Sequence, residues 1–582
     1  MRTLGWLVLL LFFSGAIAQQ CPPANFGADT YRIGVFTGQG TVKPGLKCDG
    51  STATGRECSG FLASAVDGAL LDVSVSVPPG NGPHPLIVLL HGWGGSKGSF
   101  GYLAEPLLAD GHAVLRYSAR GFGESWGQVN LADINVELAD LRSMIAQVVD
   151  EGRLHLNPDA VGVVGLSYGG GQTWLSLLQP SFSTPHGASV RIRTAVPVVP
   201  WTDLVYALMP NGKPENSLAP LGSLKLSLVN ALYVSGLREP TTRPYPNYPE
   251  YLTAWNGWLN AVEPCTLVVD PVYPQIVAGV AGYRSIWWQE AFWAGVAANR
   301  VPIFQVQGMP DDLFPLPEAT RMLQRLDPRY PIASYFGDLG HPRAANKGGE
   351  RDYLVGLIRQ WFAYYLQARG TEPEHVVHAA ITRPRAQAFN PADVKTAQSL
   401  DALANGGTLT KDFGGTARLV NPGTDPLATF TWDPLYMEAA RELEPLPPPP
   451  DSAIVAGSLA EFSFNVGAQS LIIAGQPIVS LVATPVVPAL RVQLNVRLFD
   501  LGDDGTKELI TRGTFLLDGG VLNKPVPVTI PTFGNFWEVK PNHTLKLEIS
   551  NVDSPYLRPS TLVSTTDISS VQLALPIYLP VP

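Results

Sequence analysis

Short apolar runs alternate with longer amphipathic stretches between about residues 60 and 370. Turn-forming residues follow each run, a pattern typical of strands buried on both faces. Between two of the runs, apolar residues recur at helical spacing from Leu131 to Val148, which predicts an amphipathic helix. Alternating strands and helices indicate a parallel α/β sheet covered by helices on both faces. The apolar runs are Leu86–Leu90, Ala113–Leu115, Val161–Val164, Val196–Val199, Ile303–Val306 and Ala333–Phe336.

Residues 201–295 interrupt this alternation and are rich in proline, tyrosine and tryptophan. An insertion between two strands that packs over the strand ends is a cap, and we predict a helical cap here. Its tryptophans have two interpretations: they form the core of the cap helices, or they line a pocket for an apolar or aromatic group. These residues are Trp255, Trp258, Trp287, Trp288 and Trp293.

The pattern changes again after about residue 380. Apolar and polar residues alternate from Arg491 to Leu498, which predicts a half-buried strand. The segment Asp503–Gly505 follows as a hairpin turn, and further short runs continue to the C-terminus. We therefore predict a second, all-β domain of the jelly-roll (galactose-binding-like) type. The run Pro447–Pro450 must be extended and is placed in a loop of this domain.

Composition and charge narrow the function. The chain has 582 residues, 45% of them hydrophobic, and a net charge of −9 with a pI near 5.5. This acidic balance, without a run of lysines or arginines, excludes a nucleic-acid partner, which would require a basic face. The high apolar content argues against disorder.

The N-terminus has the pattern of a secretory signal peptide over residues 1–18. Arg2 supplies the positive charge, Leu7–Phe13 the apolar region and Ala16–Ala18 an A-x-A cleavage site. The apolar region is too short to span a bilayer, and no later segment approaches about 20 apolar residues. We therefore expect a secreted or periplasmic protein with no membrane association after signal cleavage.

The four cysteines, Cys21, Cys48, Cys58 and Cys265, match no zinc-binding pattern. An exported chain meets oxidising conditions, so two disulfides in any of three pairings stand beside the alternative of four free thiols. Cys48–Cys58 is the favoured pair because it closes a short loop. Neither a metal nor an organic cofactor is expected.

The segment Gly165–Gly169 has the pattern G-x-S-x-G and directly follows the apolar run Val161–Val164. A helical segment follows, so Ser167 stands on a strained turn between a strand and a helix, the arrangement called a nucleophile elbow. The N-terminus of the helix favours negative charge that develops near this serine. We therefore predict that Ser167 is a catalytic nucleophile.

In this context the chain order is nucleophile, acid, histidine. His341 follows the short run Ala333–Phe336 and is predicted to be the general base. Asp311 and Asp312 both follow Ile303–Val306 and compete for the role of the acid that orients the histidine. Asp311 is favoured because it stands in a G-x-x-D segment with a proline four residues later. Asp312 would then be a supporting or capping carboxylate.

An oxyanion hole needs two N–H donors directed at the developing negative charge. The backbone N–H of Tyr168, directly after the nucleophile, is predicted to be one donor. The second is predicted to come from Trp93, in the loop after the run Leu86–Leu90.

With these residues, the mature chain resembles the cocaine esterase and X-prolyl dipeptidyl peptidase family. The resemblance implies an α/β-hydrolase sheet with a helical cap and a C-terminal jelly roll. Family esterases often place a tyrosine, whose hydroxyl completes the oxyanion hole, where this chain has Trp93. A backbone N–H, or the indole N–H, must therefore serve here. The resemblance rests on Gly165–Gly169, Arg120–Ser125, Asp311–Pro315, Gly340–Pro342, Arg497–Asp500 and Thr511–Gly513.

The predicted parts of the chain are a signal peptide at residues 1–18, an N-terminal segment at 19–60, a catalytic α/β-hydrolase domain at 61–379 with the cap at about 201–295, and a β domain at 380–582. Within the catalytic domain, Arg120 and Glu124 are expected to form a structural network beneath the elbow.

These observations predict a serine hydrolase that cleaves small carboxyl esters through an acyl-enzyme intermediate. The first alternative is an X-Pro dipeptidyl aminopeptidase acting on short peptides. It would need a carboxylate near the pocket for the substrate's α-ammonium group, and Asp203 and Glu290 are candidates. An amide or β-lactam acylase comes third. A carbohydrate-binding protein without activity is disfavoured, because the ordered Ser/Asp/His set would then have no purpose. No oligomeric state is predicted.

Overall fold

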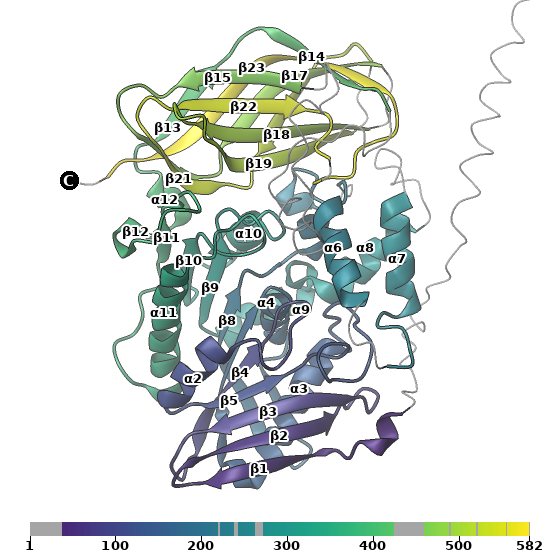
Figure 1. The fold of residues 1–582 in the computed structure, drawn as a ribbon, viewed down its shortest axis with the longest axis vertical. Coiled ribbons are helices and arrows are strands. Elements are labelled where there is room, and N and C mark those ends of the chain that lie inside the picture. The colour runs from purple at the N-terminus through teal and green to yellow at the C-terminus, as the bar shows by residue number, and fades with distance from the viewer. Residues whose placement is uncertain are drawn as a thin grey trace, which may run out of the picture.

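The computed structural model contains one large mixed sheet, helices on both of its faces and a β sandwich (Figure 1). The predicted signal peptide, Cys21, Cys265 and Pro447–Pro450 lie outside the residues that the structure describes. Of the helices within the described ranges, none is both long and apolar enough to cross a membrane. The described residues are 38–218, 222–237, 243–261, 272–423, 459–487, 491–518, 522–554 and 556–580.

Twelve strands form the large sheet in the described part of the chain. Its central strands run parallel in the order β5-β4-β6-β8-β9-β10-β11, and β1, β2, β3 and β12 extend its ends through antiparallel pairs. All six predicted strand runs overlap strands of this sheet, so the predicted α/β class is confirmed. The bounds are β1 Gly45–Ser51, β2 Gly55–Ala63, β3 Leu70–Val77, β4 His84–Leu90, β5 Ala113–Tyr117, β6 Leu156–Leu166, β7 Ser181–Ser183, β8 Ser189–Val198, β9 Ile303–Gly308, β10 Ile332–Gly337, β11 Val377–Ala380 and β12 Val394–Ala397.

Helices cover both faces of this sheet: α2 Gly101–Ala109, α3 Glu137–Asp150, α4 Tyr168–Ser176, α10 Pro317–Arg325 and α11 Gly348–Gln367. Successive side chains of a strand point to opposite faces. On β4, Ile87 and Leu89 therefore join the apolar core that includes α2 and α11. Val88 and Leu90 join the core on the other face, with α3 and α4.

The helix predicted from Leu131 begins only at Glu137, so its first part was wrong. Leu131 and Ala132 have φ angles of 62° and 59°, and the backbone N–H of Ala132 donates to the Tyr168 hydroxyl at 3.1 Å. The cap residue Arg284 donates to the carbonyl of Asn130 at 3.0 and 2.9 Å. Contacts with distant segments replace the first helical turns, although the apolar spacing fits a helix.

The cap lies between β8 and β9, as predicted. Trp258 and Trp287 are buried in its core, whereas Trp255 also lines a cavity that is described below. Both interpretations of the cap tryptophans therefore hold, for different residues. The cap helices are α5 Leu204–Leu208, α6 Leu226–Leu237, α7 Glu250–Ala261, α8 Tyr273–Arg284 and α9 Glu290–Asn299.

The C-terminal strands form two antiparallel sheets that enclose a common apolar core, which confirms the predicted all-β domain. One sheet contains β13, β14, β16, β17, β20, β21 and β23, and the other contains β15, β18, β19 and β22. A short helix, α12 (Leu400–Leu403), precedes them. The bounds are β13 Thr408–Asp412, β14 Thr416–Asn421, β15 Leu459–Asn465, β16 Leu471–Gly475, β17 Ile478–Val487, β18 Arg491–Leu501, β19 Lys507–Asp518, β20 Val526–Pro531, β21 Asn535–Val539, β22 Thr544–Ser550 and β23 Ser564–Tyr578.

Strand β18 is buried on both faces, so the prediction of a half-buried strand was wrong. Its apolar side chains face the sandwich core, and its polar side chains are also covered. Gln493 donates to Ser223 of the cap at 2.6 Å, and Arg497 pairs with Glu548 at 2.7 Å. The polar face of β18 thus belongs to the contact between the β domain and the rest of the molecule.

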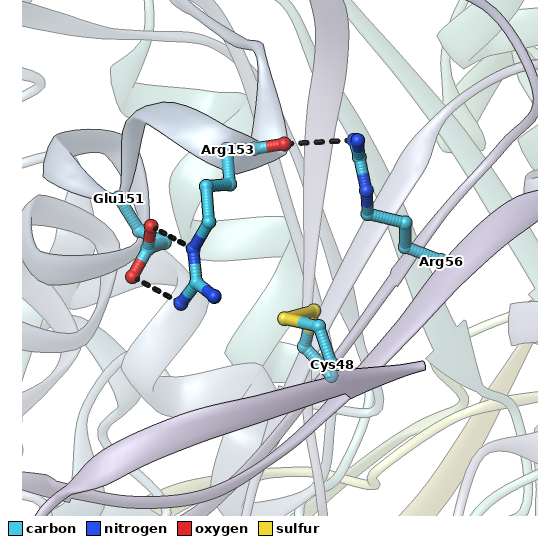
Figure 2. The surroundings of a disulfide bond; sticks show 5 residues. Cys48, Arg56, Glu151 and Arg153 are labelled. Atoms are coloured by element: carbon cyan, nitrogen blue, oxygen red, sulfur yellow. Dashed lines mark hydrogen bonds and ion pairs between the residues drawn. A yellow bond between two sulfur atoms is a disulfide. The ribbon is translucent and has the colours of Figure 1, made fainter. Parts of the chain in front are cut away.

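A disulfide joins Cys48 on β1 to Cys58 on β2, which confirms the favoured pairing (Figure 2). On the same hairpin, Arg56 donates to the carbonyl of Arg153, whose guanidinium pairs with Glu151 (Figure 2). These contacts tie the N-terminal hairpin to the loop that precedes β6.

Arg120 forms a buried network, but not with Glu124, which is exposed. Its guanidinium pairs with Asp140 at 2.6 Å and with Asp67 at 3.0 Å. The two carboxylates compensate the buried cation, which would be costly to leave unpaired.

We predict that Gly169→Ala strongly destabilises the fold. A Cβ at this position would lie 2.0 Å from the carbonyl oxygen of Leu90, so α4 or β4 would have to move. We expect a loss of about 3 kcal/mol or more, measured as a lowered thermal unfolding midpoint.

Gly356→Ala on α11 is the matched control. A Cβ there meets no atom within 4 Å, so the helix should gain about 0.5–1 kcal/mol from the alanine. Equal midpoints for the two variants would contradict the steric argument.

Candidate active site

Ser167 occupies the strained turn between β6 and α4. Its φ and ψ angles are 54° and −109°, and its backbone N–H donates to the carbonyl of Val198 at 2.9 Å. Few non-glycine residues adopt a positive φ, and such strain persists only where the surroundings enforce it. Here the close approach of β6, α4 and β8 enforces it, and the Ser167 hydroxyl is directed away from the core.

His341 and Asp311 complete a continuous chain of hydrogen bonds with this hydroxyl. Ser167 Oγ lies 2.7 Å from His341 Nε2, and His341 Nδ1 lies 2.7 Å from Asp311 Oδ2. Asp311 follows β9 and His341 follows β10, so the ends of parallel neighbouring strands bring them together. Asp311 is completely buried, and its Oδ1 accepts the backbone N–H groups of Leu313 and Phe314 at 2.9 and 3.0 Å.

Asp311, and not Asp312, is the carboxylate beside the histidine. Gly340 makes this approach possible, because a Cβ at that residue would lie 2.3 Å from Asp311 Oδ2. Asp312 turns the other way and pairs with Arg343 at 2.8 Å. The structure thus distinguishes the two neighbouring aspartates that the sequence left in competition.

The two predicted oxyanion donors lie on adjoining segments. Tyr168 is the first residue of α4, so its backbone N–H has no acceptor within the helix. The loop that contains Trp93 passes beside the nucleophile, since a Cβ on Gly92 would lie 3.6 Å from Ser167 Cβ. The Trp93 indole N–H donates instead to the carbonyl of Leu232 on α6 at 2.9 Å. Only the backbone N–H of Trp93 is therefore left for an oxyanion.

His91 holds the start of this loop in place. Its Nε2 accepts the backbone N–H of Ala119 at 2.8 Å, and its Nδ1 lies 2.7 Å from the carbonyl oxygen of Gly92. Complete burial lowers the pKa of the imidazole to about 4, so it stays neutral and keeps these two roles.

A cavity of about 120 Å³ opens beside Ser167 and extends into the cap. Its walls are almost entirely apolar or aromatic. Phe314 links the cavity to the histidine, because its ring meets the His341 ring edge-on at 4.8 Å. Trp93, Tyr248 and Tyr233 form a stacked aromatic wall. The other lining residues are Leu131, Tyr168, Trp201, Leu204, Leu208, Met209, Val229, Leu232, Leu252, Trp255, Asn256, Leu259, Ile276 and Val280.

Neither carboxylate proposed for an α-ammonium group reaches this cavity. Asp203 is completely buried, caps α5, accepts a hydrogen bond from Ser217 and pairs with Arg321 at 3.3 Å. Glu290 is exposed at the start of α9. Among the residues that the structure describes, no aspartate or glutamate lines the cavity.

In the same residues, no group of three or more His, Cys, Asp or Glu side chains could hold a metal ion.

Buried groups behind His341 hold its loop. Glu350, in the first turn of α11, accepts the Tyr335 hydroxyl at 2.9 Å and the Asp338 backbone N–H at 3.0 Å. Asp338 also pairs with Lys347 at 2.9 Å. Burial raises the pKa of the Glu350 carboxyl to about 7.

The sequence did not reveal the arginines that surround Asp312 or the part that Phe314 plays beside His341. Arg512 lies in the segment Thr511–Gly513, on which the family resemblance partly rests, but nothing in the segment indicates its partner. Phe314 follows the acid by three residues, a spacing that could have suggested it as a neighbour.

Comparison with known proteins agrees with this geometry. Residues 67–341 match the family model described as X-Pro dipeptidyl-peptidase (S15 family). This match agrees with the resemblance that the motifs predicted, and it supports a serine hydrolase that acts on esters or peptides.

Solved structures share the fold over most of the chain. An aminopeptidase from the marine sediment archaeon Thaumarchaeota archaeon is 12% identical with a TM-score of 0.61, over 92% of this chain and 98% of that one. A CocE/NonD family hydrolase from Staphylococcus aureus is 12% identical with a TM-score of 0.57, over 93% and 98%. An α-amino acid ester hydrolase is 15% identical with a TM-score of 0.58, over 92% and 98%. These similarities confirm the fold class.

Similarity to curated proteins is local. The quorum-quenching protein AidA of Acinetobacter baumannii (strain MDR-ZJ06) is 37% identical over 89 residues. The match covers 15% of this chain and 29% of that protein, so the chain spans less than a third of this relative's length.

We predict that Glu350→Gln changes how stability depends on pH. The pKa of Glu350 is raised from 4.5 to about 7 in the folded state. Its contribution to stability is therefore present at low pH and is lost as the pH rises through about 7. Between pH 5 and pH 8, the free energy of unfolding of the variant should therefore rise by roughly 2–3 kcal/mol relative to that of wild type. Urea unfolding at the two pH values measures this change.

The exposed Glu105 on α2 offers the control. The free energy of unfolding of Glu105→Gln should differ from that of wild type by the same amount at both pH values. If the free energy of unfolding of Glu350→Gln also differs from that of wild type by the same amount at pH 5 and pH 8, the prediction is contradicted.

Proposed function

We propose that this protein is an esterase that hydrolyses carboxyl esters with an apolar acyl group, through Ser167, His341 and Asp311. The observation that supports it best is the apolar cavity beside the Ser167 hydroxyl, with no described carboxylate in its lining. The continuous contacts from Ser167 through His341 to Asp311 support the catalytic step.

In the first half of the reaction, His341 Nε2 takes the proton from Ser167 Oγ as the oxygen attacks the ester carbonyl. Asp311 holds the His341 tautomer and stabilises the imidazolium that forms. The backbone N–H groups of Tyr168 and Trp93 stabilise the tetrahedral oxyanion. His341 then protonates the departing alcohol, which leaves the acyl group on Ser167.

In the second half, a water molecule replaces the alcohol. His341 takes one proton from this water, and the resulting hydroxide attacks the acyl carbonyl. The second tetrahedral intermediate collapses, Ser167 Oγ leaves with the proton from His341, and the carboxylic acid is released. No charge needs to enter the apolar cavity, which holds the acyl chain.

A second candidate is an X-Pro dipeptidyl aminopeptidase. The family match and the similarity to a solved aminopeptidase favour it. Such a substrate carries an α-ammonium group, which is costly to bury without an opposite charge. The described lining offers aromatic rings and the amide of Asn256 but no anion, so the ester is preferred. An amide or β-lactam acylase ranks third on the same argument.

The predicted signal at residues 1–18 leads us to propose that the enzyme acts in the periplasm or outside the cell. The Cys48–Cys58 disulfide supports this proposal, because disulfides persist in oxidising compartments.

The deciding experiment compares p-nitrophenyl butyrate with Ala-Pro-p-nitroanilide. We predict that wild type turns over the ester and leaves the anilide intact. Ser167→Ala should lower kcat for the ester by at least about 10³-fold, because the nucleophile is lost. Initial rates measured by nitrophenol or nitroaniline release test both points.

Ser176→Ala is the matched control, since Ser176 Oγ donates only to the carbonyl of Thr173 on the same helix. It should retain wild-type activity. Strong anilide cleavage would favour the peptidase, and an active Ser167→Ala would exclude the proposed triad.

A further prediction concerns the oxyanion hole. The Trp93 indole N–H donates its hydrogen bond to the carbonyl of Leu232 and is not an oxyanion donor in this proposal. Trp93→Phe should therefore keep kcat within about fivefold of wild type, whereas loss of an oxyanion donor lowers kcat about 10²–10³-fold. KM should rise several-fold, because the ring belongs to the cavity wall. Trp258→Phe, which removes a buried cap indole outside the lining, controls for general loss of packing. A hundredfold fall in kcat for Trp93→Phe alone would assign the donor to the indole.

A further inference from the structure

Asp312, beside the proposed catalytic acid, lies at the centre of a buried group of charges. It is completely buried and accepts from Arg343 at 2.8 Å. Arg343 follows His341 by two residues, and Asp312 follows Asp311 by one. This ion pair therefore connects the acid loop to the histidine loop directly behind the two catalytic side chains.

The β domain supplies the other side of this group. Arg512 on β19 lies 3.4 Å from Asp312 and is buried to 1% exposure. The Tyr556 hydroxyl donates to the backbone carbonyl of Asp312 at 2.9 Å, and the Arg512 guanidinium stacks on the Tyr556 ring at 4.0 Å. Strand β19 lies on the side of the sandwich that faces the cap and the hydrolase sheet (Figure 1).

Backbone carbonyls of β19 also hold Arg343. Its Nη1 donates to the carbonyls of Leu509 and Ile510 at 2.9 and 3.1 Å. Further along the acid loop, Lys225 of the cap donates to the carbonyl of Leu313 at 2.8 Å, and its ammonium lies over the ring of Phe533 from the β domain. Both loops are therefore anchored on groups that the hydrolase sheet does not provide.

We propose that Arg512 and Tyr556 of the β domain are positioning residues for catalysis, because they fix Asp312 and with it the Asp311–His341 pair. The β domain is then a working part of the active site and not only an attached module. This inference rests on the proposed triad, but it does not depend on an ester being the natural substrate.

The physical reason is the small tolerance of the proton-transfer geometry. Each of the two hydrogen bonds around His341 is 2.7 Å long, and a displacement of about 1 Å can lower a rate about 10²-fold. Without Arg512, the Asp312 carboxylate loses one of its two arginine partners and is drawn toward the other, Arg343. Because Asp311 is the preceding residue, this movement shifts Asp311 as well. The substrate cavity contains neither Arg512 nor Tyr556, so substrate binding should change little.

The test uses the full chain with three variants: Arg512→Met, Arg512→Lys and Tyr556→Phe. For ester hydrolysis we expect kcat to fall about 10–100-fold in Arg512→Met and about 3–10-fold in Tyr556→Phe, with KM within about twofold of wild type. Arg512→Lys should recover part of the loss, because it restores the charge but not the planar fork.

A double-mutant cycle then asks whether Arg512 acts through Asp312. If it does, the loss of kcat in Asp312→Asn combined with Arg512→Met is clearly smaller than the product of the two single losses, since both changes break the contact between Arg512 and Asp312. If the losses of kcat in the two single variants simply multiply in the double variant, the proposal is overturned. The proposal is also overturned if Arg512→Met and Tyr556→Phe have the thermal unfolding midpoint and the kcat of wild type. A change confined to KM would overturn it as well.

A control variant and a fallback variant complete the test. Arg418→Met removes an ion pair with Asp567 on the exposed face of the sandwich and should leave kcat unchanged. If Arg512→Met does not fold, Tyr556→Phe, which loses only one hydroxyl, decides the question alone.

The rate of labelling by a fluorophosphonate reports the reactivity of Ser167 without any choice of substrate. Labelling of wild type that slows in Arg512→Met supports the inference even if the ester is not cleaved. Equal labelling of wild type and Ser167→Ala would instead show that the proposed triad is wrong.

Discussion

The close packing of β6, α4 and the strands on either side is the constraint on which the rest of the structure depends. Gly165 and Gly169 touch so closely that a Cβ on the first would lie 2.2 Å from the carbonyl oxygen of the second. A Cβ on Gly171 would lie 2.4 Å from the Trp201 ring. This packing forces the positive φ of Ser167 and places its hydroxyl at the start of α4, beside His341. Each other part of the site is placed relative to this turn.

The parallel order of the sheet explains why so much of the site could be predicted. In a parallel sheet the carboxyl ends of the strands lie at one edge, so the loops after β4, β6, β9 and β10 meet there. Each of these loops has a local signal in the sequence, an apolar run followed by glycine and a polar residue. Ser167, His341 and Trp93 could therefore be singled out from the chain alone. For the acid, the sequence favoured Asp311 but left Asp312 open, because the two residues are adjacent in the same loop; the contact of Asp311 with His341 and the pairing of Asp312 with Arg343 distinguish them.

The features that the sequence did not predict all depend on contacts between distant segments. The residues from Leu131 to Asp133 fit a helical spacing, but Tyr168 and Arg284 hold them in a turn. The polar residues of β18 suggested an exposed face, although they are covered by the cap and the β domain itself. The pairing of Arg120 with Asp67 and Asp140 is equally invisible in the chain. In each case hydrogen bonds or ion pairs to remote residues outweigh local preference.

The division of labour between the parts of the chain follows from these contacts. The large sheet supplies the residues of the proposed triad, and the cap supplies most of the cavity wall, so the shape of the cavity can change without moving these residues. Two connections limit that independence. The indole of Trp93 binds the carbonyl of Leu232, so the position of α6 is tied to the proposed oxyanion loop. Arg343 binds both Asp312 and β19, so the histidine loop is tied to the β domain. Because both connections end within a few residues of the proposed triad or of the proposed oxyanion loop, a movement of either outer part reaches the geometry of the proposed site directly, and all three parts contribute to that site.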